Sequence, residues 1–229
     1  MTDGGAIVRR LLMFVDATGY GRSVGRRQEA IQNGLVKVLD EAAARTGLRR
    51  AEWARQPAGD GELSVLPPDE PEDRVVESFP QELAAALRRH NRDLRDEAKL
   101  RLRLAVHYGP ARPAVNGHTG AGPVTVSRLC DSEPLRAALA RSGADLAVVF
   151  SRQIFNDTIL QEHTDLEPGR LRKVRVLVKE FDEEAWIWIP GHDSSAFPAA
   201  DPALEAGRPA RGDGFHRGVT IDARSIAPE

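Results

Sequence analysis

Two short acidic segments offer the clearest chemistry in this 229-residue sequence. Asp16 follows an apolar run and precedes the glycine-containing segment 17–21, whereas Asp60 lies between two glycines. Two carboxylates on neighbouring strand ends can hold two divalent metal ions, and a glycine-containing loop beside them can turn backbone N–H groups toward phosphates. The pattern therefore predicts metal-assisted chemistry on a nucleoside triphosphate.

Each acid also has an ordinary structural interpretation. An aspartate between glycines suits a hairpin turn, which alone would explain Asp60. Asp16 could cap a helix or lie in a loop after a buried strand. The two acids together, with the segments that follow them, favour a metal site over either separate interpretation.

The composition indicates one sizeable α/β domain, with 41% hydrophobic residues and a net charge of −2. Such a charge gives no electrostatic reason to expect a nucleic-acid partner. The single cysteine, Cys130, excludes an intrachain disulfide and fits a reducing compartment. We find no secretory signal and no apolar run near the roughly 20 residues of a membrane span. A cytoplasmic protein without a membrane anchor is expected.

Strands and helices must alternate to position these acids. The apolar run 11–15 predicts a buried strand, and apolar residues at helical spacing predict a helix that ends near Gly47. The elements expected next are a hairpin over 52–67, a helix over 74–95, a strand over 100–108, a hairpin arm or loop over 109–122, a helix over 124–141 and a strand over 145–150. A helix that Ser151 caps is then expected to run to about residue 162. Strands over 174–178 and 185–189, joined by a turn at 182–184, follow it, and a flexible tail covers 191–229. The order β-α-β-β-α-β is that of a ferredoxin-like α+β core, here with C-terminal additions.

Over about residues 7–190, the chain resembles the catalytic domain of class III nucleotidyl cyclases, the adenylate and guanylate cyclase family. Five segments carry the resemblance in the family's order: Phe-Val-Asp-Ala-Thr-Gly-Tyr at 14–20, Gly-Asp-Gly at 59–61, Arg-Leu-Ala-Val-His-Tyr-Gly at 103–109, Gly120 with Ser-Arg-Leu at 127–129, and Val-Lys at 178–179. The resemblance implies a class III cyclase-like domain over 1–190, with the tail outside it.

The resemblance also implies a head-to-tail homodimer whose active sites combine residues of both subunits. One subunit would supply the residues that bind two Mg²⁺ or Mn²⁺ ions, namely Asp16, Ala17 and Asp60. The same subunit would bind the triphosphate through Thr18, Gly19, Tyr20 and Arg103. The partner would supply Lys179 for the phosphates and Arg128, whose planar guanidinium suits the charge that develops at the α-phosphate.

Several positions depart from the family pattern. Gln56 stands where a lysine is usual, Gly117 where a polar residue helps to read the base, and Glu180 where a glycine is usual. Val124 replaces the asparagine that orients the ribose, and Thr125 beside it could partly substitute. Because glutamine offers a donor and an acceptor where lysine offers only donors, the changes indicate a base specificity altered from adenine. Loss of the asparagine argues instead for weaker orientation of the attacking hydroxyl.

The sequence therefore supports a nucleotidyl cyclase, a phosphorus–oxygen lyase that forms a 3′,5′-cyclic nucleotide and pyrophosphate. The alternative is a catalytically degenerate nucleotide-binding or dimerisation module in a signalling or defence pathway, acting through a regulatory partner. A related enzyme that joins two nucleotides is a third possibility, which Arg128 and Lys179 favour less. Taken singly, Arg103 could be a solvated strand residue, and Arg128 and Lys179 could be ordinary surface cations.

Overall fold

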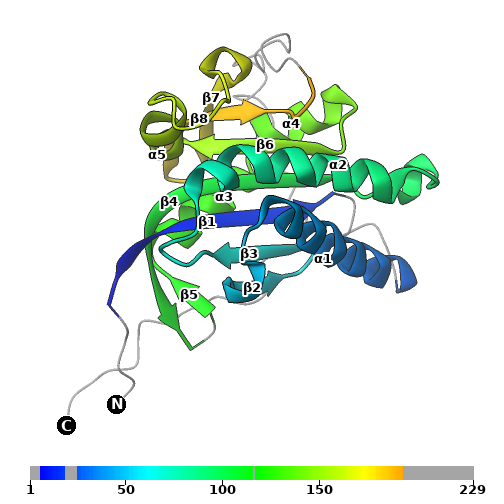
Figure 1. Ribbon diagram of the computed structural model, residues 1–229, viewed down its shortest axis with the longest axis horizontal. Coiled ribbons are helices and arrows are strands. Elements are labelled where there is room, and N and C mark those ends of the chain that lie inside the picture. Colours follow the sequence, from blue (N-terminus) through cyan, green and yellow to red (C-terminus); the bar gives the residue numbers. More distant parts are fainter. Residues whose placement is uncertain (1–5, 19–24, 116, 193–229) are drawn as a thin grey trace. The chain divides into compact units, whose positions relative to one another are not determined.

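A single mixed β-sheet organises the described part of the chain, which in this computed structural model comprises residues 6–18, 25–115 and 117–192. The strand order is β2-β3-β1-β4-β6-β8-β7, and β5 pairs with β4 (Figure 1). The strands are β1 (Val8–Ala17), β2 (Ala54–Ala58), β3 (Gly61–Val65), β4 (Leu102–Ala114), β5 (Gly117–Thr119), β6 (Leu146–Ser151), β7 (Arg172–Val178) and β8 (Phe181–Trp188). All described residues belong to one compact unit, Met1–Pro198.

Helices connect these strands. The α-helices are α1 (Arg26–Thr46), α2 (Phe79–Asn91), α3 (Ala121–Cys130), α4 (Glu133–Ser142) and α5 (Arg152–Ile154). The short 3₁₀ and π segments are η2 (Arg50–Glu52), η3 (Arg74–Ser78), η4 (Asp96–Ala98), η5 (Phe155–Ile159) and η6 (Pro168–Arg170). Within the described ranges, no helix has the length and apolarity needed to cross a lipid bilayer.

The first six core elements form the expected ferredoxin-like arrangement. β1 lies between β3 and β4 and is antiparallel to both, and β2 is antiparallel to β3. Beyond this core, β6 joins β4 in parallel, and the antiparallel pair β7–β8 completes the sheet at the β6 edge. The predicted ferredoxin-like fold with C-terminal additions is confirmed.

Helices cover the sheet on both faces, and strand periodicity assigns each side chain to one face. Leu11, Met13 and Val15 of β1 pack in the core that α1 and α2 complete, while Leu12 packs in the core of α3 and α4. Because successive strand residues point to opposite faces, Asp16 lies on the α3–α4 face of the sheet. Figure 1 shows α1 and α2 lying across the other face.

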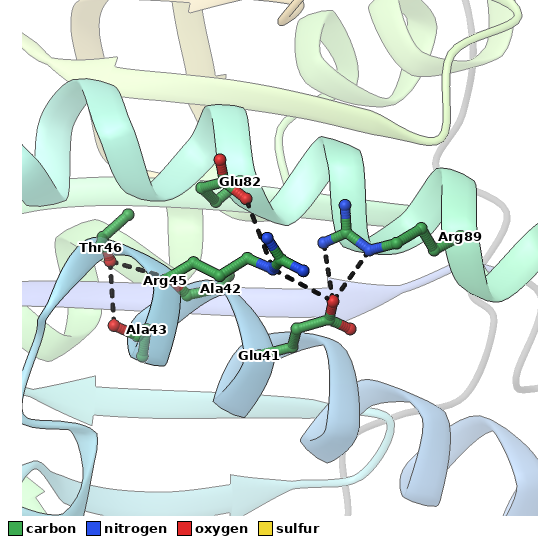
Figure 2. Close-up of polar contacts among 7 residues, drawn as sticks. All are labelled: Glu41, Ala42, Ala43, Arg45, Thr46, Glu82 and Arg89. Atoms are coloured by element: carbon green, nitrogen blue, oxygen red, sulfur yellow. Dashed lines mark hydrogen bonds and ion pairs between the residues drawn. The ribbon is translucent and has the colours of Figure 1, made fainter.

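Ion pairs on the surface link α1 to α2 (Figure 2). Glu41 accepts from Arg89 at 2.8 Å and also contacts Arg45, whose Nε lies 3.9 Å from Glu82. Such exposed pairs contribute less than about 1 kcal/mol each. The apolar residues between the two helices, including Leu39 and Leu83, therefore provide most of the stability of this layer.

Several predicted boundaries are confirmed. Helix α1 ends at Gly47, whose φ of 67° is left-handed and whose N–H satisfies carbonyls of the last turn. The hairpin over 52–67 is β2–β3, and the Ser151 side chain accepts from the Ile154 N–H as a helix cap. The segment 109–122 is the predicted hairpin arm, because β4 extends to Ala114 and returns as β5. The predicted tail, apart from 191–192, lies outside the described residues.

Two predicted elements are wrong. The helix predicted over 124–141 is two helices, α3 and α4, because α4 begins anew with Pro134 in its first turn. A proline there cannot continue a preceding helix, since it lacks the N–H and clashes with the turn before it. The turn predicted at 182–184 instead lies at 179–180, where Lys179 adopts a positive φ of 55°. The charged residues 182–184 belong to strand β8.

Candidate metal and nucleotide site

The two predicted metal acids lie together at one end of the ferredoxin-like core. Asp16 stands opposite Gly61 of β3 on one side and opposite Arg103 of β4 on the other. The Ala17 N–H donates to the Asp60 carbonyl at 3.1 Å, which ties the end of β1 to the hairpin turn. A Cβ on Gly61 would lie 2.4 Å from the Val15 carbonyl oxygen, so this close approach requires glycine.

The two neighbouring carboxylates favour the binding of a cation between them. Burial and the neighbouring Asp16 carboxylate raise the pKa of Asp60 to about 6. A divalent ion would relieve both effects, and carboxylate oxygens are the ligands that Mg²⁺ and Mn²⁺ prefer. In the described ranges, no group of three or more His, Cys, Asp or Glu side chains is placed so that it could hold a metal ion. The pair Asp16 and Asp60 thus fits a metal that completes its coordination with backbone, water or phosphate oxygens.

Arg103 lies against this acid pair and is not the solvated residue that its strand position also allowed. Its side chain is 11% exposed, ion-pairs with Asp16, and places Nη1 3.6 Å from an Asp131 oxygen. Its Nε and Nη1 are buried and have no hydrogen-bond partner in the described structure. The guanidinium therefore keeps buried N–H donors beyond its ion pair with Asp16. Asp131 was not predicted as part of the site, because it lies where a continuous helix was predicted.

A second group of predicted residues meets where α3 approaches the β7–β8 turn. Arg128 places Nη2 3.3 Å from Glu180, and its guanidinium lies 5.9 Å from the Phe181 ring centroid. Lys179 precedes Glu180 in the same turn. The structure therefore brings Arg128 beside the turn that carries Lys179, on elements separate from those that carry Asp16 and Asp60.

The predicted base and ribose residues divide between two places. Gln56 of β2 lies against Gly117 and accepts a hydrogen bond from the His118 N–H at 3.3 Å. Val124 and Thr125 lie in α3, where Val124 is 48% exposed.

The loop after β1 is described only at its start. Thr18 is exposed, and its N–H donates to the Arg101 carbonyl at 2.9 Å. The predicted phosphate residues Gly19 and Tyr20 lie outside the described residues. Their assignment, like that of the other site residues, stays a prediction.

A buried ionic network supports the hairpin that carries Asp60. Arg50 donates to both carboxylate oxygens of Glu62, at 2.8 and 3.0 Å, and its Nε lies 2.5 Å from Asp40 of α1. Ser64 donates to the same Glu62 carboxylate at 2.7 Å. Glu62 follows Asp60 by two residues, so the network holds β3 against α1 next to the acid pair. The sequence gives no signal for this network, because its members come from separate elements.

Comparison with known proteins identifies the class to which this fold corresponds. No protein-family model and no curated protein matches the sequence. Among solved structures, an adenylate/guanylate cyclase/hydrolase from Silicibacter pomeroyi matches with a TM-score of 0.53 and 20% identity, over 81% of this chain and 99% of its own. The non-canonical dimeric guanylyl cyclase domain of the RhoGC fusion protein from Blastocladiella emersonii gives a TM-score of 0.51 and 16% identity, over 81% of this chain and 99% of its own.

A third solved structure, the guanylate cyclase domain of RhGC from Catenaria anguillulae in complex with GTP, gives a TM-score of 0.50 and 16% identity, over 80% of this chain and 96% of its own. At such identities the similarity establishes the fold. The chain has the fold of the class III adenylyl and guanylyl cyclase catalytic domains, as its motifs predicted.

Proposed function

We propose that this protein is a nucleotidyl cyclase, which converts a nucleoside triphosphate to a 3′,5′-cyclic nucleotide and pyrophosphate at sites shared by two copies of the chain. The observation that carries the proposal is the close pair Asp16 and Asp60, with Arg103 beside it, on a cyclase fold. The similar structures include a cyclase domain in a non-canonical dimer and one in complex with GTP, which support association of two copies and a triphosphate substrate.

Each residue has a distinct part in this proposal. With two Mg²⁺ or Mn²⁺ ions held by Asp16, Asp60 and the backbone at Ala17, the ribose 3′-hydroxyl would lose its proton more readily. Arg103 and Lys179 would bind β- and γ-phosphate oxygens. Arg128 would stabilise the negative charge that develops at the α-phosphate as the pyrophosphate leaves. Thr18 and the loop after it would direct backbone N–H groups to the phosphates.

The direct test supplies ATP, GTP, CTP and UTP separately to the purified protein with Mn²⁺. Product masses would be measured together with released pyrophosphate. We expect one cyclic mononucleotide and pyrophosphate in equal amounts. Binding of triphosphate without any cyclic product from the four substrates would exclude the cyclase and support a binding module. A linear dinucleotide product would identify the third alternative, an enzyme that joins nucleotides.

The shared site predicts complementation between two inactive variants. Asp60→Asn and Arg128→Ala remove groups from opposite halves of each site, so either homodimer should be inactive. A mixed dimer would keep one intact site, and an equal mixture should recover roughly a quarter of the wild-type rate. Initial rates of pyrophosphate release from mixed and separately purified variants measure this. If the mixture stays inactive although the two variants are shown to have exchanged subunits, both residues belong to the same half of the site.

Glu180 is expected to compete with the substrate for Arg128. It is 84% exposed and ion-pairs with Arg128 at 3.3 Å. Because exposed pairs contribute up to about 1 kcal/mol and Arg128 is proposed to act on charge that develops in the transition state, Glu180→Gln should raise kcat by about two- to fivefold and leave KM for the triphosphate nearly unchanged. Steady-state kinetics would measure both constants, with Glu184→Gln, which removes an exposed pair with Lys173, as the matched control. A lowered kcat would show that Glu180 positions Arg128 for the reaction.

One observation favours a degenerate binding module as the second candidate. Val124 is exposed and apolar where a ribose-orienting amide is expected, so the attacking hydroxyl would be less well held. In that case the chain would bind nucleotide and dimerise, and an unidentified regulatory partner would carry the signal. Because triphosphates are abundant in the cytoplasm and Cys130 is a free, buried thiol, we propose a cytoplasmic location for either function.

A further inference from the structure

A line of alternating charges leads from the acid pair to the surface of α4. Asp16 ion-pairs with Arg103, and Arg103 Nη1 lies 3.6 Å from Asp131 Oδ1. Arg136 of α4 ion-pairs with that same oxygen of Asp131. The side chains of Asp16 and Arg103 are only 16% and 11% exposed, whereas that of Asp131 is 63% exposed. Arg103 is therefore a largely buried cation that lies between a buried carboxylate and an exposed one.

Packed backbone places Asp131 beside Arg103. Arg103 stands opposite Asp16 in the β1–β4 ladder, so the two side chains share one face of the sheet. The thiol of Cys130, a residue only 1% exposed, donates to the Arg103 carbonyl at 3.5 Å and so holds the end of α3 against β4. Asp131 follows directly, and its N–H donates to the Ser127 carbonyl at 3.0 Å. The end of α3 thus fixes where the Asp131 carboxylate lies.

The two carboxylates approach different arms of the Arg103 guanidinium. Nη2 faces Asp16, whereas Nη1 faces Asp131. Nη1 is buried and makes no hydrogen bond among the described residues, because 3.6 Å is too long for one. Since the guanidinium is planar and rigid, a movement toward Asp131 would complete this hydrogen bond at the expense of the contact with Asp16.

Arg103 and a divalent ion would compete for the Asp16 carboxylate, because both neutralise the same negative charge. An ion bound by Asp16 would weaken the attraction between Asp16 and Arg103. Arginine stays charged in proteins, and a buried charge without a counter-charge is strongly destabilising. Of the carboxylates in the described ranges, Asp131 is the second one that ion-pairs with Arg103. It is therefore the group that can take over the guanidinium.

We propose that Asp131 is a positioning residue, which holds Arg103 when Asp16 binds a metal ion and so raises the metal affinity without contacting the metal. This inference rests on the proposed function, because it requires the metal site at Asp16 and Asp60. Asp131 lowers the cost of separating Arg103 from Asp16, since the guanidinium keeps a carboxylate partner throughout.

The test is calorimetric binding of Mn²⁺, without nucleotide, to the purified protein and its variants. Asp131→Asn removes the charge at nearly the same size, so Arg103 should stay on Asp16 and the Mn²⁺ affinity should fall about three- to fivefold, the range of an exposed ion pair. Asp131→Glu keeps the carboxylate and should bind Mn²⁺ within about twofold of the unmodified protein. Glu133→Gln is the matched control: it removes the same charge from the next exposed acid, in the first turn of α4, and should leave the affinity nearly unchanged.

Removal of Arg103 separates positioning from a general effect of charge. Arg103→Gln frees Asp16 from its competitor, so the Mn²⁺ affinity should rise by roughly tenfold. In that background Asp131→Asn should have no larger effect than Glu133→Gln, because Asp131 acts through Arg103. Thermal melting would confirm that the variants are folded. If Arg103→Gln does not fold, the comparison of Asp131→Asn with Glu133→Gln decides.

Three results would overturn this inference. They are equal Mn²⁺ affinities of Asp131→Asn and Glu133→Gln, an undiminished effect of Asp131→Asn in folded Arg103→Gln, and weaker Mn²⁺ binding by folded Arg103→Gln. If the unmodified protein binds Mn²⁺ and one of these results is found, only the role of Asp131 is refuted and the proposed metal site stands. If the unmodified protein does not bind Mn²⁺, the metal site and this inference both fall.

Discussion

Asp60→Asn is expected to abolish cyclic nucleotide formation, lowering kcat on the order of a thousandfold or more, while the protein stays folded. The reason is that Asp60 is one of only two predicted carboxylate ligands in the site, and an amide neither carries the charge nor binds Mg²⁺ comparably. Product formation under single-turnover conditions with Mn²⁺ would measure the loss. Asp93→Asn, on an exposed residue after α2, is the control and should keep full activity. Substantial activity in Asp60→Asn would remove Asp60 from the metal site.

The same variant should be more stable than the unmodified protein when metal is absent. Burial and Asp16 raise the pKa of Asp60 to about 6, above the usual carboxyl value, so the folded state holds this proton more tightly than the unfolded state. Ionised Asp60 therefore destabilises the fold, and stability falls as pH rises from about 4 through 6. Because the group is partly exposed, the substitution should add only about 1 kcal/mol at pH 7.5 and little at pH 4.5. Urea unfolding in EDTA at both pH values would measure this, and a less stable variant at pH 7.5 would contradict it.

Arg50→Met is expected to cause the largest loss of stability, about 3–5 kcal/mol in the free energy of unfolding. Both Arg50 and Glu62 are buried, so the substitution leaves a carboxylate inside the protein without its bidentate partner. Urea unfolding at neutral pH measures the change. Arg45→Met is a matched control, because it removes only the exposed pairs with Glu41 and Glu82 and should cost about 1 kcal/mol or less.

A double variant separates the charge effect from lost packing. Arg50→Met with Glu62→Leu removes both charges, so most of the stability should return. If the double variant is as unstable as the single one, the packing of the Arg50 stem and its contact with the Trp53 ring would account for the loss. Metal affinity of the double variant would then report whether the network also positions the neighbouring Asp60.

The acid pair could be predicted from the sequence because local patterns determine the positions of both residues. A continuous apolar run ends at Asp16, and flanking glycines make Asp60 a turn residue. The spatial pairing of the two acids then follows from the ferredoxin-like strand order, in which β3 lies beside β1. Gly47 was predicted as the end of α1 for an equally local reason, because glycine commonly ends helices, and its left-handed φ of 67° confirms it.

Other features depend on tertiary contacts and could not be predicted in the same way. Arg103 alternates away from the α1–α2 core, which suggested solvent, but α3 and α4 cover that second face and bury it. Apolar residues continue at helical spacing across the α3–α4 junction, which concealed both the break and Asp131. The β7–β8 turn uses Lys179 at positive φ, where glycine or asparagine would have been the signal.

The hydrogen bond from the Ala17 N–H to the Asp60 carbonyl has a consequence for redesigning this protein. Together with the close approach of Gly61 to the Val15 carbonyl, it makes the spacing of the two acids a property of the main chain. Gln56 and Gly117, to which the resemblance assigns recognition of the base, lie on β2 and β5, outside that backbone contact. If the protein is the proposed cyclase, the residues at these two positions could therefore be exchanged while the acid pair keeps its spacing, so that one scaffold could be adapted to make different cyclic nucleotides.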